Sequence, residues 1–146
     1  MIGTVQGIEE RENEIIEEFS VFDDWMDKYE HIIGLGQELP LIDESLKTED
    51  LLIKGCQSRV WLHAKLEDDK VIFTADSDAI ITKGIISLLV RVLSGQTTDA
   101  IINSDMSFVN QIGLKEHLSP TRSNGLVSMI KQMKLYALAF KTQQNG

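Results

Sequence analysis

Hydrophobic side chains between Glu9 and Ile33 recur at alternating steps of four and three residues. This spacing places them on one face of an α-helix and leaves the acidic side chains on the opposite face. The pattern predicts one long amphipathic N-terminal helix, which Gly34 in the left-handed conformation would end. The stripe consists of Ile15, Phe19, Phe22, Met26, Tyr29 and Ile33.

An irregular connector begins at Pro40, because proline disfavours helix in the residue before it. The next segments have the two-residue period and the composition of β-strands, separated by turn residues. They predict a small antiparallel sheet of about three strands. The predicted strands are 51–53, 60–66 and 71–73, with a polar turn at 67–70.

Two further helices are predicted from capping signals and apolar patterns. Asp76, Ser77 and Asp78 are candidate N-caps for a buried central helix over 79–93. Ser119 and Pro120 are typical of the first positions of a helix, here a long C-terminal one. Its apolar stripe is Leu126, Ile130, Met133, Ala137 and Phe140, and Gly125 near its start indicates either a close backbone approach or a tolerated glycine.

This order of elements predicts an α+β fold. The length suits a single domain over residues 1–146, with its core at about 9–141 and frayed ends at 1–7 and 141–146.

The formal net charge of −9 argues against a nucleic-acid-binding surface. Residues 1–50 carry 15 acidic and three basic side chains, whereas residues 51–146 carry eight acidic and 11 basic ones. No apolar run approaches the roughly 18 residues of a membrane span, and no export signal precedes the predicted helix. With one cysteine, these features favour a cytoplasmic protein.

Cys56 is the single cysteine, which excludes an internal disulfide and a multi-cysteine metal cage. It is either a small packed hydrophobe or a nucleophile that acts on a second molecule. Gly55 beside it permits a positive φ at a loop. Nucleophilic chemistry needs the thiolate, and Lys54, Arg59 and His63 are the local cations that would favour it.

The three histidines are scattered along the chain, which gives no spacing typical of a zinc site. A cysteine-nucleophile hydrolase or transferase would need His63 or His117 brought to Cys56. The sequence leaves this alternative open.

Three spaced motifs resemble the SufE-type sulfur acceptors, which partner cysteine desulfurases in iron–sulfur cluster assembly. The resemblance covers about residues 10–140, and the acidic N-terminus departs from it. The motifs are Gly55-Cys56-Gln57-Ser58-Arg59-Val60-Trp61; Asp76-Ser77-Asp78-Ala79 with Lys83-Gly84; and Leu118-Ser119-Pro120-Thr121-Arg122 with Gly125-Leu126.

The resemblance implies a fold similar to the IscU-type scaffold proteins and a role as sulfur carrier rather than enzyme. A SufS-like desulfurase, which uses pyridoxal phosphate, would hold sulfur as a persulfide; Cys56 would take it and deliver it to a SufBCD-like scaffold complex. The carrier would also stimulate the desulfurase, need no cofactor or metal of its own, and be a monomer or weak homodimer.

The same resemblance assigns expected roles to individual residues. Cys56 is the nucleophile and carrier, and Gly55, Gln57 and Ser58 support its loop. The residues expected to stabilise the thiolate or contact the partner are Lys54, Arg59, His63, Asp76, Asp78 and Arg122.

Overall fold

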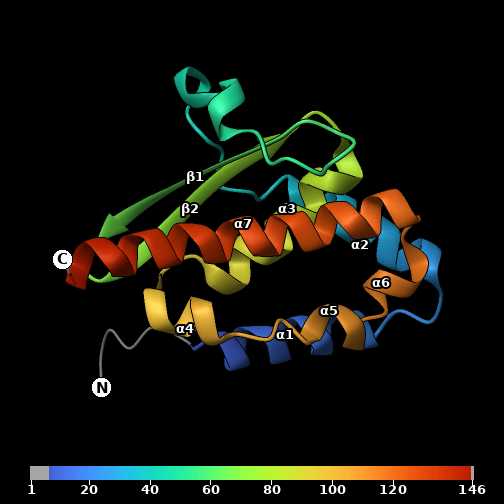
Figure 1. Cartoon of the computed structure of the whole chain (residues 1–146). Helices are drawn as coiled ribbons and strands as arrows, with labels where there is room; N and C mark the ends of the chain where they lie inside the picture. Colours follow the sequence, from blue (N-terminus) through green and yellow to red (C-terminus); the bar gives the residue numbers. More distant parts are fainter. Residues whose placement is uncertain (1–6, 146) are drawn as a thin grey trace.

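Helices pack against one face of a small antiparallel sheet in the computed structural model of the chain, which describes residues 7–145 and the side chains to residue 144 (Figure 1). This is the predicted α+β fold. The helices are α1 (Ile8–Ser20), α2 (Trp25–Gly36), α3 (Ile80–Leu93), α4 (Thr98–Asn103), α5 (Phe108–Gln111), α6 (Leu114–His117) and α7 (Pro120–Asn145). The strands are β1 (Val60–Glu67), β2 (Lys70–Ser77) and β3 (Gln96–Thr97), and two short 3₁₀ turns are η1 (Glu44–Leu46) and η2 (Glu49–Leu51).

β1 and β2 form the predicted hairpin, with their ends paired as Val60↔Ser77 and Glu67↔Lys70. Alternate residues of both strands are buried, as the two-residue period requires. The buried side chains on the core face are Val60, Leu62, Ala64, Val71, Phe73 and Ala75.

The third strand is not the predicted one. Residues 51–53 form the end of η2 and a single bridge, Leu52↔Trp61, because the chain turns away after Ile53. The third strand of the described sheet is β3, which pairs with β2. Gly95 (φ +84°) reverses the chain between α3 and β3, and its N–H donates to the Val71 carbonyl.

The prediction of one long N-terminal helix is wrong, because the chain turns between α1 and α2. Asp24 caps α2 by accepting a hydrogen bond from the Asp27 N–H at 2.9 Å. The apolar spacing runs across this turn, which hid it in the sequence. Met26, a member of the expected stripe, is 67% exposed, and Ile32 rather than Ile33 is fully buried.

The predicted end of the N-terminal helix is also wrong. Gly34 lies within α2, which ends at Gly36 with a right-handed cap at Gln37. α7 continues to Asn145, so residues 141–145 are helical. Fraying of residues 1–7 and 141–146 stays a prediction, and residues 1–6 and 146 lie outside the described part.

α3 lies at the centre of the core and packs on α1, α2, α7 and β2. Ten of its 14 residues are buried, as predicted for the central helix. Gly84 allows the closest approach, because a Cβ there would lie 2.1 Å from the Ile32 carbonyl oxygen of α2. Residue 84 must therefore be a glycine for these two helices to pack as they do.

α7 extends along the molecule beside the sheet, with α4, α5 and α6 on its other side (Figure 1). Ser119 caps it, accepting from the Arg122 N–H at 3.3 Å as predicted. The Tyr136 hydroxyl donates to the Leu62 carbonyl at 3.0 Å and so ties the helix to β1. The buried stripe contains Leu126, Met129, Met133 and Ala137. Within residues 7–145, no helix has the length and apolar character to cross a membrane.

Replacing Gly84 with alanine should destabilise the protein by about 3 kcal/mol or more, because a backbone carbonyl cannot yield as a side chain can. Gly34→Ala is the matched control, since a Cβ at this helical, exposed position meets nothing within 4 Å. It should stabilise the protein by about 0.5–1 kcal/mol. Urea unfolding followed by circular dichroism measures both; equal effects of the two substitutions would contradict the packing described.

Candidate functional site around Cys56

Cys56 lies on a loop whose two ends are tied by backbone hydrogen bonds. On one side, the Ile53 N–H donates to the Val60 carbonyl at 2.8 Å. On the other, the Arg59 N–H donates to the Asp78 carboxylate at 3.1 Å, and the Asp78 N–H donates to the Arg59 carbonyl at 3.2 Å. These bonds hold the base of the loop against the start of β1 and the end of β2.

Gly55 turns the chain into the cysteine with φ +92°, the positive value anticipated from the sequence. A Cβ at Gly55 would also lie 2.5 Å from the Ser128 hydroxyl of α7, which would have to rotate away. The tip of the loop is therefore pressed against this helix.

The Cys56 thiol is half-buried and points at the backbone of α7. Its Sγ donates a weak hydrogen bond to the Gly125 carbonyl at 3.6 Å. A Cβ at Gly125 would lie 3.5 Å from Sγ, an ordinary van der Waals contact, so the loop lies directly against this glycine although space alone does not require one. Burial raises the pKa of the Cys56 thiol, which stays neutral in this resting arrangement.

A cavity of about 70 Å³ lies beside the thiol. It is small, and both polar and apolar side chains from the loop, α3 and α7 surround it. The lining residues are Cys56, Gln57, Ser58, Thr82, Ile85, Thr121, Arg122, Gly125 and Met129.

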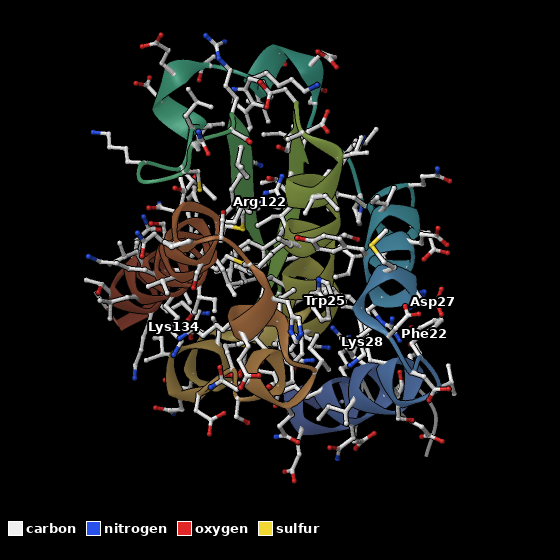
Figure 2. The ribbon with its side chains drawn as sticks, turned by 90° about the vertical axis from the view of Figure 1, so that its right-hand side faces the viewer. Phe22, Trp25, Asp27, Lys28, Arg122 and Lys134 are labelled. Carbon is white, nitrogen blue, oxygen red and sulfur yellow. The ribbon has the colours of Figure 1, made fainter. Side chains whose placement is uncertain are left out.

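The cations close to Cys56 in sequence are not those close to it in space. Lys54 and Arg59 are exposed, His63 lies on β1, and none of the three lines the cavity. Arg122 does line it, although its position is 66 residues away in sequence. Its Nη1 donates to the Tyr29 hydroxyl at 3.4 Å, so Arg122 bridges the start of α7 to α2 (Figure 2).

The prediction that Asp76, Ser77 and Asp78 cap α3 by their side chains is wrong in detail. The N-cap is Ala79, and no side chain caps the helix. The Ser77 hydroxyl accepts from the Ala79 N–H, while Asp78 supports the cysteine loop through Arg59. The Asp76 and Asp78 side chains form contacts with other segments of the chain instead of capping α3.

Asp76 joins three segments around the base of the site. The Asp76 side chain is 12% exposed, and its carboxylate accepts hydrogen bonds from Lys47 Nζ at 2.7 Å and from Lys83 Nζ at 3.3 Å. Burial alone would raise the pKa of Asp76, but the hydrogen bonds from Lys47, the Ser77 N–H and Lys83 outweigh it and lower the pKa. Lys47 also lies 5.5 Å above the ring of Trp61 on β1. Sequence reasoning missed Lys47, since nothing local indicates that the connector folds back onto β2.

The histidines lie away from the cysteine. His31 contacts Glu18 at 3.1 Å, and His117 stacks on Trp25 with ring centroids 4.1 Å apart. None of the three histidines lines the Cys56 cavity. Among the described residues, no group of three His, Cys, Asp or Glu side chains is arranged to hold a metal ion.

Fold and site together define a small α+β protein that holds one loop cysteine against a helix backbone. The family model "SufE: Fe-S metabolism associated domain" matches residues 13–137. The chain therefore belongs to the SufE family, which is associated with Fe–S metabolism.

Curated relatives cover most of the chain. It is 37% identical over 140 residues to "SufE-like protein 1, chloroplastic/mitochondrial" of Arabidopsis thaliana, covering 93% of this chain but 38% of that relative. It is 39% identical over 127 residues to an uncharacterized SufE-like protein of Rhizobium meliloti, covering 84% of this chain and 91% of the relative.

A solved structure supports the fold. The solution structure of a hypothetical protein from Thermus thermophilus superposes with a TM-score of 0.75, covering 90% of this chain and 96% of that one. At 20% identity, this likeness concerns the fold alone.

The Asp76→Asn variant should lose about 1–3 kcal/mol of stability at pH 7, because it leaves two partly buried ammonium groups without their carboxylate. A lowered native pKa stabilises the fold above the ordinary carboxyl pKa, and this contribution is lost as pH falls through the native value. The difference between wild type and variant should therefore shrink on acidification. Urea unfolding from pH 7 to pH 3.5 tests this.

Asp69→Asn, in the exposed turn between β1 and β2, is the control for the loss of one carboxylate and should have little effect. A deficit in Asp76→Asn that stays constant across the pH range would contradict the proposed ion pairs.

Alkylation of Cys56 by iodoacetamide should show its pH midpoint above that of the same chain unfolded in urea, because burial raises the native pKa. At pH 7 the native protein should react more slowly than the unfolded one. Loss of free thiol over time measures both rates. Identical profiles for native and unfolded chains would mean that the thiol is not held against α7 in solution.

Proposed function

We propose that this protein accepts sulfur from a cysteine desulfurase onto Cys56, stimulates that enzyme, and delivers the sulfur to an iron–sulfur scaffold. The single observation that carries the proposal is the placement of Cys56, a lone thiol on a glycine-turned loop that rests against Gly125. Membership of a family associated with Fe–S metabolism supports the same interpretation.

The loop is built to present its tip while its base stays fixed. The base has three backbone-directed hydrogen bonds at Ile53, Arg59 and Asp78, whereas the described hydrogen bond of the thiol is one weak contact to Gly125. Weak sulfur hydrogen bonds contribute far less than N–H···O bonds. We therefore propose that a partner can draw out residues 54–58 without unfolding β1.

The proposed transfer moves one sulfur atom without net oxidation. Cys56 loses its proton, and its thiolate attacks the terminal sulfur of the desulfurase persulfide. The S–S bond of the desulfurase breaks as the new S–S bond to Cys56 forms, and the desulfurase cysteine leaves as a thiolate. Handing the sulfur on to a scaffold thiol repeats the same exchange and regenerates Cys56.

The alternative of a cysteine-nucleophile hydrolase or transferase has no supporting observation. Such an enzyme would need a base within hydrogen-bond reach of the nucleophile. His117 instead stacks on Trp25 and donates from Nδ1 to the Gly113 carbonyl at 2.9 Å.

The remaining site residues enter the proposal by position. Gln57 and Ser58 border the cavity and support the loop, and Arg122 is the cation best placed to meet the partner beside the thiol. Lys54, Arg59 and His63 stay as candidate partner contacts. One continuous buried cluster from Ile15 to Ala137 supports the further proposal that the chain acts as a single domain.

Incubation with a cysteine desulfurase and cysteine should add one sulfur atom to the Cys56 peptide, detected by mass spectrometry of the alkylated, non-reduced protein. Cys56→Ser should carry none. The double variant Cys56→Ser/Ser58→Cys is a matched control that keeps one thiol on the same loop, and it should be loaded at least about tenfold more slowly if the position beside Gly125 matters.

Full stimulation of desulfurase turnover by Cys56→Ser, with no sulfur on the wild-type peptide, would reject the carrier role and leave a binding-only activator. An acyl adduct on Cys56 and turnover without any desulfurase would favour the hydrolase alternative.

A further inference from the structure

The outer face of α7 has an unusual charge for this protein. The chain carries a net charge of −9, yet the helix contains four basic residues and no aspartate or glutamate over its 26 residues. The basic residues are Arg122, Lys131, Lys134 and Lys141. Two of them, Lys131 and Lys134, are interleaved with apolar side chains on a face that the core does not use.

That face borders an open groove of about 450 Å³ between α7 and the segment from α4 to α6. Val127, Leu135 and Leu138 lie along it with 48%, 46% and 50% of their surface exposed. The floor is formed by Met106 and Val109, which are 2% and 3% exposed. We call this the α7 groove. Exposed apolar side chains that cluster in one patch often mark an interaction site, whereas single exposed apolar side chains are common on any protein surface.

Lysines border the α7 groove on both sides. Lys115 comes from α6 and Lys131 from α7; both are exposed, and within the described residues neither forms an ion pair. Lys134 extends from α7 towards the α4–α5 segment, where its Nζ donates to the Ser104 carbonyl (Figure 2). Asp105 is the one carboxylate in the lining, and the Ser107 N–H already donates to it. The border is therefore positive.

The α7 groove and the Cys56 site use different faces of the same helix. At about 100° per residue, Val127, Lys131 and Leu138 project roughly 120–160° away from Gly125, whose carbonyl contacts Cys56. Ser128 lies between the two faces of the helix. An occupant of the groove would leave Cys56 accessible.

We propose that the α7 groove binds an amphipathic α-helix of a partner protein, whose apolar face is bordered by acidic side chains. The groove positions 127, 131, 134, 135 and 138 follow helical spacing over about 17 Å, the length of a three-turn helix. Acidic borders on that helix would meet the lysines. This surface is independent of sulfur transfer and does not rest on the proposed function of Cys56.

Two other occupants fit the observations less well. A second copy packed isologously would bring Lys131 and Lys134 of both copies together, at an electrostatic cost. An anionic membrane would repel a chain of net charge −9, and it would meet a concave groove instead of the convex apolar ridge that inserts into lipid.

The test uses a synthetic amphipathic peptide of about 14 residues, acetylated and amidated, with leucines at i, i+4, i+7 and i+11 bordered by glutamates. Titrated into the ¹⁵N-labelled full chain, it should shift amide signals of α7 and of the α4–α5 segment and leave those of residues 54–58 unchanged. Leu135→Asp and Lys131→Glu should each weaken binding about tenfold, equivalent to about 1.4 kcal/mol.

Matched controls separate the groove from general surface effects. Val21→Asp, at a position 73% exposed outside the groove, and Lys65→Glu, on β1, should leave the affinity unchanged. A peptide with lysine in place of glutamate should bind at least about tenfold more weakly. Circular dichroism of each variant confirms that the fold is retained.

Four results would overturn the proposal. The first two are an absence of shifts in the α7 groove at millimolar peptide, and equal binding of the lysine peptide. The third is binding of phosphatidylglycerol vesicles that Leu135→Asp abolishes, while the glutamate peptide leaves the groove signals unshifted; the fourth is a dimer in sedimentation that Leu135→Asp converts to monomer. None of these measurements involves a desulfurase, so failure here leaves the proposed sulfur transfer untouched.

Discussion

The position of the Cys56 thiol depends on α7 passing the cysteine loop at residues that have small side chains or none. The Cys56 sulfur contacts the backbone carbonyl of Gly125, and Gly55 lets the loop come within contact of Ser128. Both contacts require α7 to be held firmly, since a helix that shifted by an ångström would either strike the loop or leave the thiol in solvent. The buried stripe of α7 and the Tyr136–Leu62 hydrogen bond provide this anchoring.

Packing against α7 shields the Cys56 thiol and lowers its reactivity. Burial raises the pKa of the Cys56 thiol, so the neutral form dominates near neutral pH. Such a thiol is a weaker nucleophile at neutral pH than one with an ordinary pKa. The contacts that hold the loop are weaker at its tip, where the thiol has the weak Gly125 contact, than at its base, where Ile53 and Asp78 are hydrogen-bonded. The contrast concentrates any motion in the segment that carries the sulfur atom.

Local signals in the sequence predicted the hairpin, the α7 helix and the loop that carries Cys56. They did not predict the features that depend on contacts between distant segments of the chain. The turn after α1 was missed because the apolar spacing continues through Asp24, whose capping role only the structure reveals. Asp76 looked like a helix cap, yet Lys47 pairs with it from a connector with no regular pattern. The backbone contact of Cys56 comes from α7, 69 residues further along the chain, and the local hint of it is a glycine in a helix. Arg122 likewise borders the cavity from far away in sequence.

The uneven distribution of charge along the chain corresponds to different structural elements, and α7 is the basic one. Acidic residues dominate the first 50 positions, while the C-terminal helix is wholly basic among its charged residues. One face of this helix fills the core, a second supports the cysteine loop, and a third presents lysines around exposed apolar side chains. Because the three faces share one rigid element, a partner held on the third face would have a fixed position relative to the helix surface that supports the Cys56 loop. A helix of this kind can set the distance between a docking surface and the resting position of a thiol without any contact between the two.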